Sequence, residues 1–195
     1  MAEENIPFME NAKLQWLLIG AVFSLPFIIF YAIENPTSTI AMVLFIEPSY
    51  TKIKKGYPIL DDFESYSSVE EVTSDLALHN YQFTVSAKNL GQGPKPYELK
   101  TVDVRYFVHL DQPGALKLIF FNDRLSHATF FPHSVEDYKE ELDAELRKPL
   151  SLNETRPLGH YILLKFGIEG VDRYYFRWED RRLITEEMAW QMRHS

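Results

Sequence analysis

The stretch TVDVRYFVHLDQPGALKLIFFNDRLSHATFF, residues 101–131, indicates the fold class of this 195-residue chain. Its first part alternates: one side of the predicted strand carries Val102, Val104, Tyr106, Val108 and Leu110, and the other carries Asp103, Arg105, Phe107 and His109. Such alternation is typical of a strand with one buried and one wetter face, as in an antiparallel sheet. Turns at residues 111–114 and at Asn122 and Asp123 separate it from further strands at 115–121 and 125–131. The stretch therefore predicts an antiparallel meander.

Two similar segments lie on either side of the meander, SVEEVTSDL at residues 68–76 and SVEDYKEEL at residues 134–142. In each, a serine is suited to cap the start of a helix, and Ser68 with Glu71 forms the pattern of a capping box. Apolar residues then recur at helical spacing, namely Val69, Val72 and Leu76 in the first segment and Val135, Tyr138 and Leu142 in the second. Both segments predict helices that bury one stripe.

The remaining elements of the domain are shorter. We expect a strand at 81–85, a loop rich in Gly and Pro at 87–97, and two strands at 159–166 and 172–178 joined by a turn at 167–170. A tight turn at Glu179 and Asp180 would lead to a strand at 181–184, and Thr185 would cap a short final helix. The sequence thus predicts an α+β domain at residues 58–195, in which antiparallel strands pack with two main helices and a short C-terminal helix.

The pattern around Asn122 and Asp123 also recurs around Glu179 and Asp180: an aromatic strand end, an acidic turn, then Arg and Leu. Together with the two helix segments, this repetition leaves two explanations open. The chain is either a duplication with a shortened second copy or two independent uses of common solutions for starting helices and hairpins.

Residues 14–33, LQWLLIGAVFSLPFIIFYAI, contain no charge, and only Gln15 and Ser24 are polar. Twenty helical residues span about 30 Å, the thickness of the hydrocarbon core of a bilayer. We therefore expect a single transmembrane helix after an N-terminal tail at residues 1–13, whose acidic start is unlike a signal peptide. The residues that support the anchor are Trp16 and Tyr31 near the two ends, Pro26, which membrane helices tolerate, and the small-residue strip Gly20, Ala21 and Ser24.

Residues 34–57 are expected to form a linker with a short apolar segment at 40–46, either a strand or a segment at the membrane surface. Lys13 is the only lysine or arginine ahead of the predicted span, and residues 34–48 contain neither. This distribution favours a cytoplasmic N-terminus and an extracytoplasmic C-terminal domain, periplasmic or equivalent. The margin is one or two charges, so the inverted insertion stays an alternative.

Composition removes several function classes. The chain has 20 Lys and Arg against 28 Asp and Glu, a net charge of −8, which argues against nucleic acid as a partner. It has no cysteine, and its six histidines are not spaced as in a zinc motif. No nucleophile elbow or phosphate-binding loop is present. The sequence predicts no catalytic residue, no cofactor and no metal site.

The aromatic strand near the C-terminus gives the best functional indication. Tyr174, Phe176 and Trp178 would line one face of this strand, and Tyr175 and Arg177 the other. Tyr, Trp and Arg are the residues that dominate protein interfaces, so we take these five as the candidate interface.

A domain without evident chemistry on a single span usually acts by binding. The leading hypothesis is an accessory, scaffolding or assembly subunit of a membrane complex, with the lipid bilayer and other membrane subunits as partners. The alternatives are a membrane-tethered, hydrolase-like enzyme and a ligand sensor.

Overall fold

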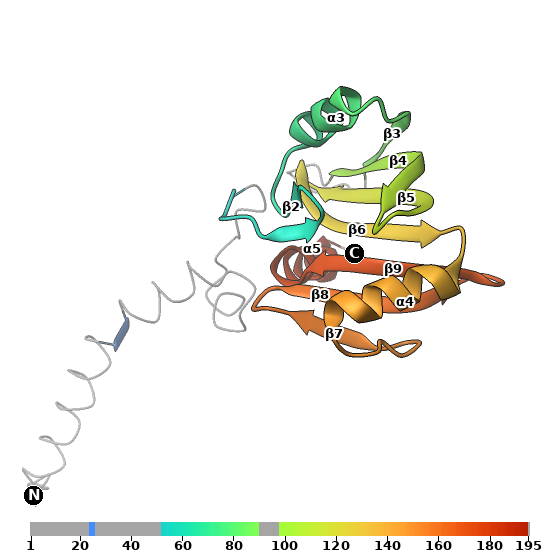
Figure 1. The fold of residues 1–195 in the computed structure, drawn as a ribbon. Helices are drawn as coiled ribbons and strands as arrows, with labels where there is room; N and C mark the ends of the chain where they lie inside the picture. The colour runs from blue at the N-terminus through green and yellow to red at the C-terminus, as the bar shows by residue number, and fades with distance from the viewer. Residues whose placement is uncertain (1–23, 26–51, 90–97, 195) are drawn as a thin grey trace, which may run out of the picture. The chain divides into compact units, whose positions relative to one another are not determined.

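The computed structural model describes residues 24–25, 52–89 and 98–194, and its chain divides into two compact units, Met1–Ser49 and Tyr50–Ser195. The second unit is an α+β domain with three helices and antiparallel strands (Figure 1), which confirms the predicted class. Its elements are β1 (Pro58–Leu60), β2 (Phe63–Glu64), α3 (Val69–Leu78), β3 (Phe83–Asn89), β4 (Glu98–His109), β5 (Gln112–Phe121), β6 (Arg124–Pro132), α4 (Val135–Leu146), β7 (Thr155–Leu158), β8 (Ile162–Glu169), β9 (Arg173–Asp180) and α5 (Arg181–His194).

Seven strands form one antiparallel sheet in the order β3-β4-β5-β6-β9-β8-β7, and β1 pairs with β2 in a small separate hairpin. The sheet has two halves. The first is the meander that follows α3, and the second is the set of strands that follows α4. The last strands of the two halves, β6 and β9, pair in the middle of the sheet, with Phe130 opposite Phe176. The pairing of the halves is therefore non-sequential, and neither half's local sequence pattern reveals it.

Both predicted helix starts are confirmed. The Ser68 side chain accepts a hydrogen bond from the Glu71 amide at 3.2 Å, and the Glu71 carboxylate accepts one from the Ser68 amide at 2.7 Å. Ser134 caps α4 by accepting a bond from the Asp137 amide at 3.4 Å. The expected stripe residues Val72, Leu76, Tyr138 and Leu142 are buried.

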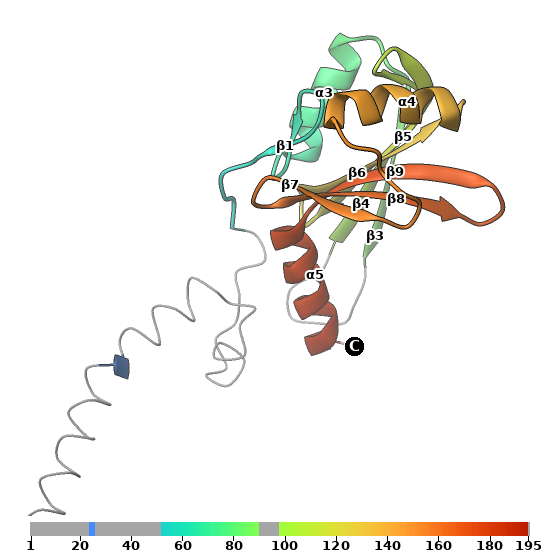
Figure 2. The same cartoon turned by 60° about the horizontal axis from the view of Figure 1, so that its bottom comes forward.

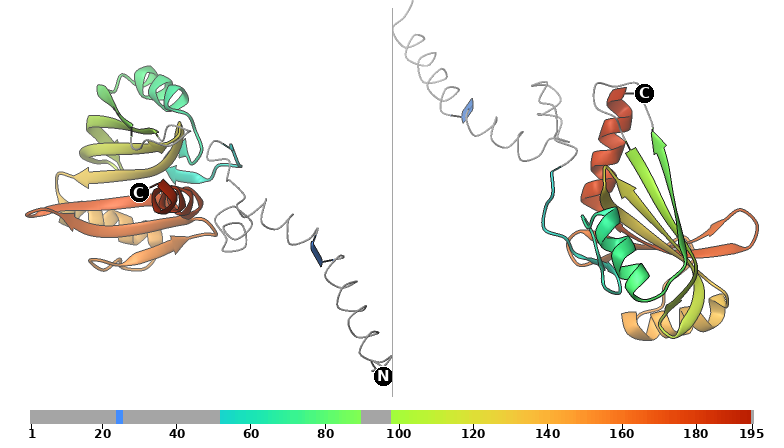
Figure 3. Two further views of the ribbon diagram at one scale, coloured as in Figure 1. Left: turned by 180° about the vertical axis from the view of Figure 1, so that it is seen from behind. Right: turned by 90° about the horizontal axis from the view of Figure 1, so that it is seen from above.

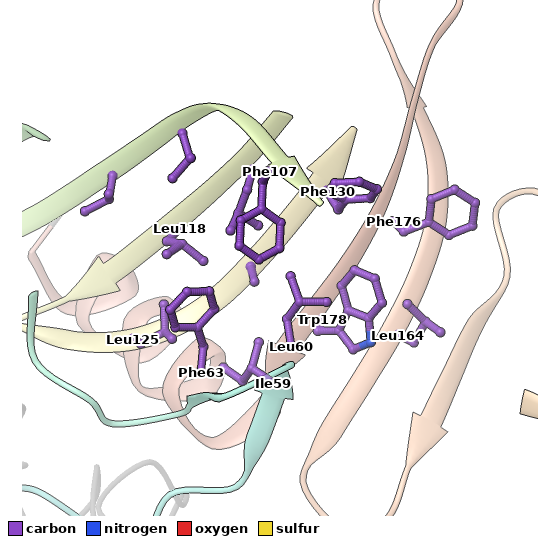
Figure 4. Close-up of a cluster of buried hydrophobic side chains, with 14 of the residues drawn as sticks. Ile59, Leu60, Phe63, Phe107, Leu118, Leu125, Phe130, Leu164, Phe176 and Trp178 are labelled. Carbon is purple, nitrogen blue, oxygen red and sulfur yellow. The ribbon is translucent and has the colours of Figure 1, made fainter. Parts of the chain in front are cut away.

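One face of the sheet forms the core, and α3, α4 and the β1–β2 hairpin cover it. Figure 2 shows α3 and α4 on the same side of the strands, and Figure 4 shows Leu60 and Phe63 of the hairpin close to the side chains of the sheet. Phe130 and Phe176, from the two central strands, are fully buried here. The two halves of the domain thus share one continuous core.

The alternation predicted for β4 is correct for Val102 and Val104 and wrong beyond them. The register shifts between Val104 and Phe107, because three steps on β4 match two on β5. Such a bulge moves every following side chain to the other face. Phe107 and His109 are buried, whereas Tyr106 is 59% exposed. The expected turn at 111–114 also moves, to Leu110 and Asp111, which both have positive φ.

The C-terminal elements differ from the prediction in two places. The expected turn at 167–170 is shifted, because Gly167 lies within β8 and the chain turns with positive φ at Gly170 and Asp172. The expected turn at Glu179 and Asp180 and the strand at 181–184 are wrong, because β9 continues to Asp180 and α5 begins at once at Arg181.

The cause of the second error lies at the junction of β9 and α5. The Asp180 carboxylate accepts a hydrogen bond from the Arg182 amide at 2.9 Å, as a residue that starts a helix does. Thr185 lies inside α5, where its hydroxyl donates to the Arg181 carbonyl. Each half of the domain therefore consists of a helix followed by strands. The hairpin that the sequence suggested around Glu179 and Asp180 is not formed, because residues 181–184 belong to α5.

The start of the domain includes residues ahead of the expected boundary at Pro58. The buried Arg124 guanidinium donates from Nη1 to the Lys52 carbonyl at 3.0 Å and to Glu186 Oε2 at 2.9 Å. Lys54 pairs with the other oxygen of Glu186 at 3.2 Å, and Arg182 donates to the Lys55 carbonyl. The chain that enters the domain is thereby fixed to α5 and to the start of β6.

The predicted membrane anchor lies outside the described residues, apart from Ser24 and Leu25, which are helical. This applies to Trp16, Gly20, Ala21, Pro26 and Tyr31, and to the segment at 40–46. None of the helices in the described ranges is both long and apolar enough to cross a membrane.

Candidate binding surface

The second face of the sheet, opposite α3 and α4, is polar in its middle. Residues on neighbouring strands line up across all seven strands in one register row: Thr84, Asp103, Lys117, Thr129, Arg177, Lys165 and Thr155. We call this the polar row. Residues directly opposite each other in a sheet share a face, and the apolar neighbours of the five central members, from Asp103 to Lys165, point into the core. The row thus places cations from three different strands on one surface.

A second row lies beside the first. It places His127 of β6 directly opposite Glu179 of β9. Glu179 is 5% exposed, and its Oε1 pairs with Lys165 Nζ at 2.7 Å. This pair connects the two rows. Glu179 was expected in a turn, and only the continuation of β9 brings it onto this face.

Helix α5 packs against the same face of the sheet but covers only part of it. Leu183 and Trp190 pack in a small cluster with Phe121 and Tyr66, and Leu99 borders this cluster. Figure 3 shows α5 from behind, and Figure 2 shows it on the side away from α3 and α4. Among the residues that the structure describes, no other helix or strand covers the polar row.

Arg177 is held in place by neutral groups. Its Nε donates to the Thr129 hydroxyl at 3.0 Å, and its guanidinium lies 4.8 Å from the centroid of the Tyr175 ring. Tyr175 lies across its cross-strand neighbour Gly167, where a Cβ atom would come within 2.6 Å of the tyrosine oxygen. Within the described ranges, neither Arg177 nor Lys117 forms an ion pair. Both cations are thus free to meet a carboxylate from outside the chain.

The charge of the row also acts on His127. The pKa of His127 is lowered to about 3, first by burial and then by the positive charges of Arg177, Lys165 and Lys117, in that order. His127 is therefore neutral at physiological pH. The same three cations that suppress its protonation give this part of an acidic protein a positive local field.

The structure divides the five expected interface residues between two environments. Phe176 and Trp178 are in the core, and Tyr174 is partly buried against it. Tyr175 and Arg177 lie on the polar face and are half-buried. No sequence pattern identified Lys117, Thr129 or Lys165 as site residues. In the sequence, each of these residues is marked only as a polar residue between two apolar ones. The strand register that places them in one row depends on the pairing of β6 with β9.

One serine and one histidine lie in contact on this face, as in the nucleophile–base pair of many hydrolases, but their geometry does not suit catalysis. The Ser126 hydroxyl lies 3.2 Å from His127 Nδ1, but it donates to the Ile119 carbonyl at 2.9 Å. Ser126 is fully buried. A nucleophile needs a basic partner and access to substrate. In the described part of the chain, no group of three or more His, Asp and Glu side chains is placed to hold a metal ion.

Comparison with known proteins gives no family. No protein-family model matches the chain, and no curated protein matches its sequence.

Proposed function

We propose that the chain is a membrane-anchored accessory subunit that binds a partner subunit through the polar row of its sheet. The observation that carries this proposal is the row itself. It contains two cations without a carboxylate partner among the described residues, beside an aromatic ring, on a face that α5 covers only in part.

The charge balance of the row favours an acidic partner. Lys117, Arg177 and Lys165 contribute three positive charges to the row, and Asp103 contributes one negative charge. Glu179 in the second row adds another negative charge, which is already paired with Lys165. Charge complementarity of this kind steers association and fixes register more than it adds affinity. The expected partner segment therefore presents Asp or Glu side chains to the centre of the sheet.

The attachment of residues 52–55 supports the same role. Arg124 and Arg182 hold the backbone at the C-terminal end of the predicted linker, so that the entry of the chain is fixed to the domain. An accessory subunit needs such a fixed attachment if its binding surface is to be presented in one orientation.

The proposal is tested by charge reversal in the full-length chain. Membranes are extracted gently, and stoichiometric partners are identified by mass spectrometry for the wild type, Lys117→Glu and Arg177→Glu. The matched control is Lys148→Glu, an exposed charge reversal beyond the end of α4. We expect both polar-row variants to lose the partner and the control to retain it.

Salt provides a second measurement in the same experiment. Exposed charge pairs are screened at high ionic strength, so the wild-type complex should weaken as salt rises. A wild-type chain that is recovered alone, or a partner that survives both charge reversals, contradicts the proposal.

A further inference from the structure

A cavity of about 320 Å³ lies on the helix-covered side of the sheet, and most of the residues that line it are apolar. Its apolar lining includes Leu60, Leu110, Leu142, Leu146, Leu158 and Trp178. These residues come from β1, the β4–β5 turn, α4, β7 and β9. Pockets for small molecules have volumes of roughly 300–1,000 Å³ and combine an apolar lining with few polar groups. The cavity has the size and composition of such a site.

Three titratable residues also line this cavity: Asp61, His109 and Glu145. His109 is buried, with Nε2 3.2 Å from Asp61 Oδ1 and Nδ1 2.7 Å from the Tyr138 hydroxyl. A neutral imidazole satisfies both contacts, because the tyrosine hydroxyl can donate to Nδ1 while Nε2–H donates to the carboxylate. His109 thereby fixes the Asp61 carboxylate at the edge of the cavity.

The electrostatic field at this site is negative. Burial raises the pKa of Tyr138 well above its usual value, and the charges of Asp61 and Glu145 raise it further. Both carboxylates therefore act on a hydroxyl beneath the cavity. In the described ranges, neither Asp61 nor Glu145 forms an ion pair with a lysine or arginine. A positive charge that entered the cavity would find two carboxylates without a permanent cation.

We propose that this cavity binds a small organic cation that has an apolar body. The ammonium group lies at the carboxylates of Asp61 and Glu145, and the apolar body packs against Leu142, Leu146 and Trp178. The indole ring of Trp178 can add a cation–π contribution. This inference does not rest on the proposed partner binding, because the cavity and the polar row lie on opposite faces of the sheet.

The test uses the full-length chain in lipid nanodiscs with methyl-labelled leucines. Three probes of similar shape are titrated and followed by NMR: phenylbutylamine, phenylbutanol and phenylpentanoate, which are positive, neutral and negative. We expect the amine to bind most tightly and the carboxylate least. The shifts should be largest at Leu142 and Leu146 and absent at Leu183, which belongs to the separate cluster under α5.

Two charge-removing variants assign the recognition to the carboxylates. Glu145→Gln changes an exposed side chain, and Asp61→Asn keeps an acceptor for His109 at a position whose φ of 47° suits asparagine. Each should weaken the amine by about fivefold, the effect of a partly exposed charge pair, and leave the alcohol unchanged. The control Glu141→Gln, on an exposed position of α4, should change neither.

Two outcomes would overturn the proposal. One is an alcohol that binds the wild type as tightly as the amine. The other is a set of shifts at leucines outside the cavity, which would show that the probes partition elsewhere.

Discussion

At the scale of single residues, the buried pair of Arg124 and Glu186 fixes the entry of the chain to the domain. Their side chains are 2% and 6% exposed, and Arg124 also contacts the rings of Tyr66 and Phe121. Burying two charges is favourable only while each retains its partner. A single substitution in this pair is therefore expected to release residues 52–55 from the domain and to weaken the contact between α5 and β6.

Glu186→Gln should destabilise the domain by about 3 kcal/mol, because it leaves a buried guanidinium without its counter-charge. Denaturant unfolding of the full-length chain measures the change. The control is Glu141→Gln, which removes a carboxylate from an exposed position. Equal stability of the two variants would mean that the Arg124 contact contributes nothing net.

His127 makes the stability of the folded domain fall as the pH is lowered. Burial and the neighbouring cations lower the pKa of His127 from 6.5 to about 3, so between these pH values the unfolded chain binds a proton that the folded chain does not. The stability that comes from neutral His127 is complete above pH 6.5 and is lost as the pH falls towards 3.

His127→Asn should therefore flatten the fall in unfolding free energy between pH 6.5 and 3, and His160→Asn, at an exposed position, should not. Denaturant unfolding at a series of pH values compares the slopes. An unchanged slope in His127→Asn would show that the histidine titrates normally in the folded domain.

At the scale of elements, the two helix starts use the same residue type but different numbers of hydrogen bonds. Ser68 takes part in a reciprocal capping box with short bonds, whereas Ser134 accepts a single bond of 3.4 Å. The second start is therefore the weaker cap, although the two segments look alike in sequence.

Ser68→Ala should cost about 1 kcal/mol of stability, and Ser134→Ala should cost less. Chemical denaturation of both variants beside the wild type provides the comparison. A larger loss from Ser134→Ala would show that the helix starts are not limited by their caps.

The elements also show where sequence patterns are sufficient. Helix caps and two-residue turns are local, and Ser68, Ser134, Asn122 and Asp123 could be interpreted correctly without any knowledge of the rest of the chain. The bulge before Phe107 could not be predicted, because it arises from pairing with β5, which decides the face of every later residue in β4. The start of α5 was missed because Glu179 and Asp180 resemble a turn when their pairing with β8 is unknown.

At the scale of the whole molecule, the pairing of β6 with β9 joins two helix-plus-strand halves into one sheet and creates both candidate sites. On one face it completes the polar row, since Thr129 and Arg177 come from different halves. On the other face it brings Trp178 towards the residues that surround His109, with ring centroids 5.5 Å apart. Neither site could be predicted from the sequence, because each combines residues whose proximity depends on this non-sequential pairing.

The most direct test of the central claim is site-specific photo-crosslinking of the full-length chain in intact native cells. A photoreactive phenylalanine analogue is placed at Thr84 or Tyr175 on the polar face, and at Glu141 or Lys148 on the helix-covered side. We expect one and the same protein to be captured from both polar-face positions and from neither control position. Capture from the control positions alone, or no capture from the polar face, would contradict it.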